Sequence, residues 1–319
     1  MSLSVEAITE RYIIGQRALS EIAQAYFFEG RLEEALSLFQ AGEHLLEARE
    51  LSPESRLDWL LEYGLFVVHY YYLTGMQKDL MASVLQRARQ AAEASQQETK
   101  IATAFYLVGQ ASYYQNLLSG GTDYSAARDM LQKASQLYEK HGDNYKLAEA
   151  LFYTGLTYDR QQQDERSREH YLRALALGEQ YGNKWAASEA MRHLTDYSDG
   201  EQRLHYALGS LTLREELGSK VYVPSAQLLL SDIYIERGEL EKALEYCQQA
   251  ERLNKEMELE ARLIGVLVVK GEIAYKQDRL AEARERWEQA FSLSQKYKAA
   301  HWLPIIEEKL KLLADGAQS

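Results

Sequence analysis

The sequence has 319 residues, of which 46% are hydrophobic and 26% are charged, a balance that excludes a disordered chain. Its 36 basic and 48 acidic residues give a formal net charge of -12, which disfavours direct binding to the phosphates of a nucleic acid. The N-terminal segment contains Glu6 and Glu10 and lacks the basic and apolar regions of a signal peptide. The apolar stretch at 65–73 is too short to span a bilayer. We therefore expect a cytoplasmic protein that binds neither nucleic acid nor membrane.

Residues 224–254 predict two helices joined by a tight turn. Residues 228–234 supply an apolar helical face, Gly238 interrupts it, and apolar residues then recur every three or four positions over 240–253. One such hairpin cannot bury its apolar face alone, so copies of it must stack. No sustained alternation of period two predicts a strand. The fold class expected is all-α.

The same pattern recurs in chain order. It predicts an α-solenoid of about seven hairpins in one superhelical domain spanning 1–319. The hairpins are expected roughly at 16–49, 57–93, 99–140, 145–182, 185–218, 223–256 and 261–297, with a C-terminal capping helix at 299–314. The second, third and fifth copies are irregular. Residues 1–15 and 315–319 are expected to be only a short lead-in and a short tail.

The motif Leu230-Ser231-x-x-Tyr234 followed by Ala243-x-x-x-Cys247 resembles the tetratricopeptide repeat signature. Equivalent positions lie 40 residues apart, as from Ala243 to Ala283, whereas the usual repeat is about 34 residues long. The links at 141–144, 181–184 and 217–220 each place Gly before Asp, Asn or Ser. This predicts a left-handed helix end followed by a new helix cap.

This long variant resembles the repeat arrays of bacterial maltose-regulator-like activators and Rap-type peptide-sensing regulators. Those proteins join the array to an effector domain, and we expect this chain to be the sensor or adaptor alone. The resemblance implies that the first helix of each hairpin lines a concave peptide-binding groove. The groove residues it implies are Phe27, Leu65, His69, Tyr72, Tyr106, Gln110, Tyr113, Phe152, Asp159, Arg160, Arg192, Asp232, Glu272 and Tyr275.

The expected groove is aromatic in its N-terminal half and net acidic in its C-terminal half. Tyrosine suits peptide capture because it offers a large contact area at low entropic cost, although motif tyrosines such as Tyr158 pack between helices. A helix cannot turn Tyr70, Tyr71 and Tyr72 the same way, so one or two of them should lie in the core. A chaperone-type carboxylate clamp is not expected, because the equivalent inner positions offer little positive charge.

Catalytic and metal-binding chemistry has no support in the sequence. The 7 histidines have no metal-ligand spacing, and the nucleotide-binding and hydrolase motifs are absent. His69 could titrate near neutrality, but a polar groove residue is the preferred interpretation. Cys247 occupies an apolar helical position, which favours a buried inert thiol over a nucleophile. We expect no cofactor, no metal and no enzymatic activity.

The leading hypothesis is a non-catalytic scaffold that binds a protein or peptide in the groove. The alternative is a regulatory receptor for a signal peptide or small ligand that switches a partner. An enzyme accessory with a site between helices is a third possibility. Self-association through the apolar residues Trp302, Leu303, Ile305 and Ile306 of the last helix is a fourth.

Overall fold

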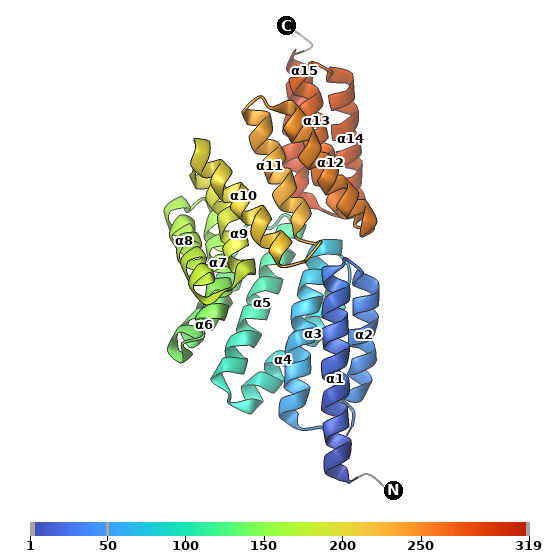
Figure 1. The fold of residues 1–319 in the computed structure, drawn as a ribbon, viewed down its shortest axis with the longest axis vertical. Helices are drawn as coiled ribbons and strands as arrows, with labels where there is room; N and C mark the ends of the chain where they lie inside the picture. Colours follow the sequence, from blue (N-terminus) through green and yellow to red (C-terminus); the bar gives the residue numbers. More distant parts are fainter. Residues whose placement is uncertain (1–3, 49–50, 317–319) are drawn as a thin grey trace.

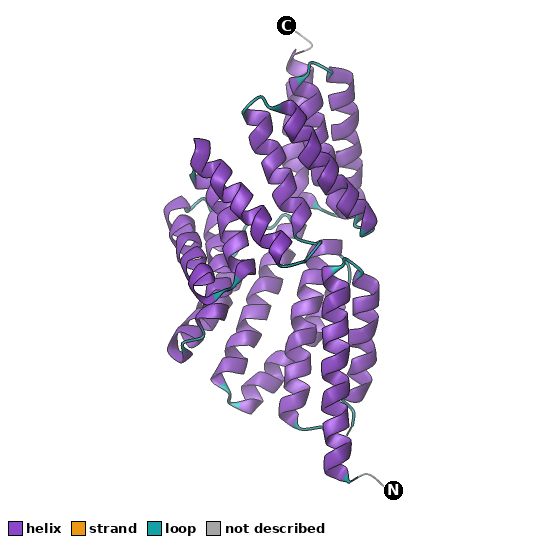
Figure 2. Ribbon diagram, in the orientation of Figure 1, coloured by secondary structure: helices purple, strands orange, loops and turns teal. Residues whose placement is uncertain are grey.

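The computed structural model describes residues 4–48 and 51–316, so the predicted bounds at 1, 49 and 319 lie outside the described residues. Within these ranges all regular structure is helical (Figure 2). The α-helices are α1 (Val5–Phe28), α2 (Leu32–Leu45), α3 (Pro53–Thr74), α4 (Lys78–Ser95), α5 (Glu98–Ser119), α6 (Ser125–His141), α7 (Asn144–Asp159), α8 (Asp164–Tyr181), α9 (Lys184–Leu194), α10 (Gly200–Glu216), α11 (Val223–Glu236), α12 (Leu240–Glu256), α13 (Leu263–Lys276), α14 (Leu280–Lys296) and α15 (Leu303–Gly316). Three short 3-10 helices are η1 (Thr195–Tyr197), η2 (Glu260–Arg262) and η3 (Ala300–Trp302).

Consecutive helices pair into hairpins, from α1 with α2 to α13 with α14, and α15 covers the last pair (Figure 1). The predicted α-solenoid of seven hairpins and a capping helix is confirmed. On α15, Ile306 is fully buried while Ile305 remains 43% exposed. Self-association through this helix stays a prediction.

In the hairpins α7–α8 and α13–α14, a glycine on the first helix receives a large side chain from the second. A Cβ added at Gly155 would lie 2.7 Å from the Tyr171 ring, and one added at Gly271 would overlap the Trp287 indole. Tyr171 and Trp287 are both fully buried, as are Ala243 and Ala283, one repeat apart. The small and large positions of the sequence motif are therefore the packing positions between the paired helices.

The links at 141–144 and 181–184 have the predicted caps. Gly142 and Gly182 are left-handed, with φ of 68° and 75°. The Asp143 side chain accepts a hydrogen bond from the Lys146 N–H at 3.1 Å, and Asn183 accepts one from the Ala186 N–H at 3.0 Å. The link at 217–220 has the predicted left-handed glycine, with φ of 66° at Gly218, but Ser219 is buried and does not cap α11.

That third link instead touches the first hairpin. The Lys220 N–H donates to the Phe28 carbonyl oxygen at 2.8 Å, and Met257, at the end of α12, packs over Gly30. The superhelix thus closes on itself, and the N-terminal helices meet the C-terminal ones end to end along the long axis of the molecule (Figure 1). We define the seam as the contact of the links 217–223, 257–262 and 297–302 with the turns at 28–30, 72–75 and 120.

Candidate ligand-binding cavity

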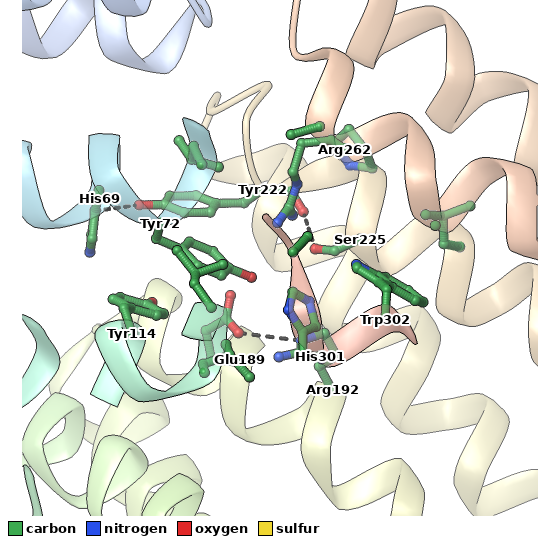
Figure 3. Close-up of a pocket in the computed structure, with 18 of the residues that line it drawn as sticks. His69, Tyr72, Tyr114, Glu189, Arg192, Tyr222, Ser225, Arg262, His301 and Trp302 are labelled. Atoms are coloured by element: carbon green, nitrogen blue, oxygen red, sulfur yellow. Dashed lines mark hydrogen bonds and ion pairs between the residues drawn. The ribbon is translucent and has the colours of Figure 1, made fainter. Parts of the chain in front are cut away.

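A cavity of about 410 Å³ lies inside the superhelix, next to the seam (Figure 3). Its walls come from the first helices α3, α5, α7, α9, α11 and α13, and its remaining side from the links of the seam. The labelled lining residues in Figure 3 are His69, Tyr72, Tyr114, Glu189, Arg192, Tyr222, Ser225, Arg262, His301 and Trp302. The first helices therefore line the concave side, as the repeat resemblance implies.

The α3 and α5 side of the cavity is aromatic, as predicted. The ring of Tyr72 stacks on Tyr114, with centroids 4.3 Å apart and an angle of 18°. The Tyr114 hydroxyl in turn bonds the Tyr153 hydroxyl at 2.6 Å. Tyr70 and Tyr71 are buried, with 1% and 6% exposure, so only Tyr72 of the three consecutive tyrosines faces the cavity. The expected division of this tyrosine run between groove and core is confirmed.

Glu189 forms the centre of a buried ionic network on the α9 side. Nη2 of Arg214, which is 1% exposed, donates to Oε1 of Glu189 at 2.6 Å, and Nε of Arg192 donates to Oε2 at 3.3 Å. Burial opposes ionisation of Glu189, but Arg214 and Arg192 outweigh it and lower the pKa of the carboxyl. Arg214 also donates to the Tyr222 carbonyl oxygen at 2.5 Å. The network therefore fixes the link that crosses the seam.

His69 is a neutral polar contact across the seam. Its Nδ1 lies 3.0 Å from the Tyr222 hydroxyl oxygen. Burial lowers the pKa of His69 to about 4, although the charge of Glu189 opposes the shift. The expectation that His69 could titrate near neutrality is therefore wrong, because its ring is desolvated. Its preferred role as a polar residue of the cavity wall agrees with this position.

The cavity also contains more positive charge than predicted. Arg262, in the link before α13, places its guanidinium 5.2 Å from the centroid of the Tyr72 ring. Burial disfavours the Tyr72 phenolate, but Arg262 and Arg192 outweigh it and lower the pKa of the hydroxyl. Arg160, which also lines the cavity, donates from Nε to the Tyr113 hydroxyl at 3.3 Å. The charged side chains that line this cavity are therefore Arg160, Arg192 and Arg262 with Glu189 and Asp232. The net acidic charge expected for the C-terminal half of the whole groove stays a prediction.

Part of the predicted site lies in the cavity and part does not. The predicted residues that line it are His69, Tyr72, Tyr113, Phe152, Arg160, Arg192 and Asp232. The other predicted residues do not line this cavity. Phe27 packs against Phe66 in the core, Leu65 is 39% exposed, and fully buried Gln110 donates to the Tyr106 hydroxyl at 2.9 Å.

The remaining predicted residues are engaged with their own or adjacent hairpins. Asp159 accepts a hydrogen bond from the Tyr197 hydroxyl at 2.9 Å, and Glu272 pairs with Lys309 of α15 at 2.5 Å. Tyr275 packs beside Trp287, with ring centroids 5.9 Å apart. These three side chains lie outside the cavity, in contact with η1, the capping helix and the core of their own hairpin. Their role in binding stays a prediction.

Several cavity residues were missed by sequence reasoning. Tyr114 and Glu189 lie on first helices beside predicted residues, so a wider reading of the helical face could have found them. Tyr222, Arg262 and His301 lie in links, and they reach the cavity only because the superhelix closes. No local pattern in the sequence marks those three.

Residues 224–257 match the family model described as tetratricopeptide repeat. This stretch is a tetratricopeptide repeat. The match confirms the signature in the sixth predicted hairpin. No curated protein sequence matches the chain.

Solved structures with the same fold include repeat regulators. A Rap protein complexed with Competence and Sporulation Factor has 17% identity and a TM-score of 0.67, over 97% of this chain and 87% of that chain. The Rap conjugation gene regulator of plasmid pLS20, in complex with the Phr* peptide, has 15% identity and a TM-score of 0.66, over 86% and 72%. NprR in complex with its cognate peptide NprX has 12% identity and a TM-score of 0.56, over 93% and 82%. The resemblance to Rap-type arrays is thus confirmed at the level of the fold.

We also searched the described residues for a metal-ion site, a membrane-spanning helix and a reactive thiol. Among these residues, no group of three or more His, Cys, Asp or Glu side chains could hold a metal ion, and no helix is long and apolar enough to cross a membrane. Cys247 is fully buried, and burial raises the pKa of its thiol to about 12. The prediction of a buried thiol at this position is confirmed, and its high pKa disfavours a nucleophilic thiolate.

Proposed function

We propose that the chain is a non-catalytic regulator or adaptor that binds a peptide segment in its central cavity. The observation that supports this most is the partly open cavity of about 410 Å³, a volume within the size range of ligand sites. Its tyrosine wall offers rigid contact area, and its arginines offer donors to backbone and carboxylate oxygens. Neighbours of the same fold were solved with bound peptides.

A binding role also fits the electrostatics of the site better than catalysis. The carboxylate of Glu189 is held by two arginines, so it is not free to act as a base. Burial lowers the pKa of both His69 and His301 to about 4, which keeps them neutral near physiological pH. We further propose that the protein acts in the cytoplasm, without a cofactor, and contacts a protein partner rather than nucleic acid or membrane.

Affinity selection from a synthetic library of short peptides, read by mass spectrometry, tests the proposal. Tyr72→Ala removes the stacked ring at the cavity wall, whereas Tyr181→Ala removes a tyrosine on the outer end of α8 that is 45% exposed. We expect the wild type and the Tyr181 variant to retain the same peptides, and the folded Tyr72 variant to lose them. Equal retention by all three proteins would place the binding site elsewhere, and no retained peptide would contradict peptide binding.

The regulatory receptor is a second candidate, because the cavity and the seam share residues. Tyr222 and Arg262 line the cavity and belong to links of the seam, so a ligand that touches them also changes the contact between superhelical turns. Small-angle scattering with a saturating selected peptide measures this change. An unchanged envelope would favour a constitutive adaptor over a switched receptor.

A further inference from the structure

The first helix of the array, α1, leaves an apolar face uncovered. Ile14 and Ile22 are 58% and 46% exposed, and Ala18 and Ala25 on the same face are exposed as well. These four residues are three or four positions apart, so they form one stripe along the helix. The end of a repeat array usually presents a polar face to the solvent, and this stripe of α1 does not.

The equivalent positions of later hairpins are buried. Ala23, Gly155 and Ser231 occupy the same position of the repeat motif, three residues before a tyrosine. Counted from them, the residues equivalent to Ala18, Ile22 and Ala25 are Ala150, Thr154 and Thr157 on α7 and Ala226, Leu230 and Ile233 on α11, each at most 3% exposed. On α7 the preceding hairpin covers this face, because Arg128 of α6 donates to the Thr157 hydroxyl oxygen at 3.0 Å. Among the described residues, α1 has no preceding hairpin to cover it.

The charged side chains beside the stripe also lack partners. Arg17 and Glu21 are exposed, and neither forms an ion pair or a side-chain hydrogen bond in the part of the chain that the structure describes. Elsewhere such charges bridge adjacent hairpins, as Arg173 of α8 does to Glu139 of α6 at 2.6 Å. The face of α1 therefore has both apolar and charged groups available for a second molecule.

We propose that this face of α1 binds the same face of a second copy of the chain, with the two helices antiparallel about a two-fold axis. With the axis beside residues 19 and 20, Ile14 of one copy lies opposite Ala25 of the other. In the same register Ile22 lies opposite Ala18. Each large side chain thus meets a small one, which lets the helices approach closely and interdigitate.

The same register also pairs the free charges. Arg17 and Glu21 lie on one edge of the stripe, about 40° apart around the helix. Arg17 of one copy therefore meets Glu21 of the other, and the two-fold axis repeats the pair. This self-complementary charge selects a second copy, rather than an unrelated protein, as the occupant. Because each copy contributes only one helix, the dimer should be weak, with a Kd of about 1–100 µM.

Sedimentation velocity over a concentration series, from about 1 µM to about 300 µM, tests the proposal. We expect the wild type to pass from the 36.6 kDa monomer to a dimer. Ile22→Lys should weaken the dimer by about a hundredfold, because it places a charge in the apolar contact. Leu172→Lys is the matched control, since Leu172 is 39% exposed on α8, and circular dichroism verifies that both variants are folded. A wild type that stays monomeric, or a dimer that Ile22→Lys leaves intact, would overturn the proposal.

Charge reversal tests the antiparallel register. Arg17→Glu and Glu21→Arg each place like charges opposite one another, so each variant alone should dimerise about tenfold more weakly at low salt. An equimolar mixture of the two variants should dimerise as tightly as the wild type, because each supplies the charge that the other lacks. A mixture that associates no more tightly than either variant alone would show that the two side chains do not meet and that the register is wrong.

Discussion

The turns at Gly30 and Gly238 have the same local structure, but the first is covered by another part of the chain and the second is open. Each ends the first helix of a hairpin, with φ of 81° at Gly30 and 75° at Gly238. Each also donates its N–H to a carbonyl oxygen three residues earlier, at 2.9 Å and 3.0 Å. A left-handed residue at a helix end is the reason for glycine at both positions.

Their surroundings differ because only one of them lies in the seam. Gly30 is covered by Met257, whereas a Cβ added at Gly238 would have no atom within 4 Å. The repeat sequence thus encodes the turn, and the closure of the superhelix decides which turns become buried. The cavity residues show the same contrast. Those predicted on helices follow from the repeat sequence, whereas Tyr222, Arg262 and His301 in the links reach the cavity only through closure.

The largest loss of folding stability should follow from breaking the ionic network of Glu189, which fixes the link at 217–223. Arg214→Met leaves the buried carboxylate of Glu189 without its closest partner and removes a bond to the Tyr222 carbonyl. We expect a loss of about 3–5 kcal/mol in the free energy of unfolding, measured by urea denaturation. In Arg173→Met, which removes an exposed pair outside the seam, the loss should be below about 1 kcal/mol. Equal losses in the two variants would mean that Arg214 adds nothing beyond a surface pair.

Alanine at the two glycines separates local strain from seam packing. Both variants force a left-handed alanine, at a cost of about 1–2 kcal/mol. Gly30→Ala must also displace Met257, which is 7% exposed and belongs to the core, so its loss should exceed that of Gly238→Ala by about 1–3 kcal/mol. Thermal or urea unfolding of both proteins gives the difference. A difference near zero would show that Met257 moves aside without cost and that the seam is loosely packed.

The helices and their pairing could be predicted from the sequence because both depend on neighbours along the chain. Gly155 and Tyr171, or Gly271 and Trp287, are complementary within one hairpin. Arg262 could not be placed in the cavity this way, because its position depends on the sum of the small rotations between all the intervening repeats. Closure also explains why the cavity has Arg262 in its lining, although the C-terminal half of the groove was expected to be net acidic.

Acid should weaken the seam through His69. The ring binds a proton near pH 6.5 when unfolded but only near pH 4 when folded, so protonation favours the unfolded chain. Stability should therefore fall as the pH falls from 6.5 towards 4, by at most about 1.4 kcal/mol per pH unit for this one group. His69→Gln should reduce the slope of unfolding free energy against pH over that window, while His205→Gln, an exposed control on α10, should leave it unchanged. An identical slope in the wild type and both variants would exclude His69 as the titrating group.

The smallest change in folding stability is expected from breaking the exposed ion pair of the seam, between Lys220 and Glu29. Nζ of Lys220 lies 2.5 Å from Oε2 of Glu29, but the two side chains are 46% and 54% exposed, so solvent and salt screen the attraction. Lys184 and Glu216, at 46% and 49% exposure, form a matched pair outside the seam. Lys220→Ala should change the urea midpoint no more than Lys184→Ala does, because the backbone bond from the residue 220 N–H to the Phe28 carbonyl is kept. A clearly larger shift for Lys220→Ala, lost at high salt, would show that the charge pair itself helps to hold the superhelical turns together.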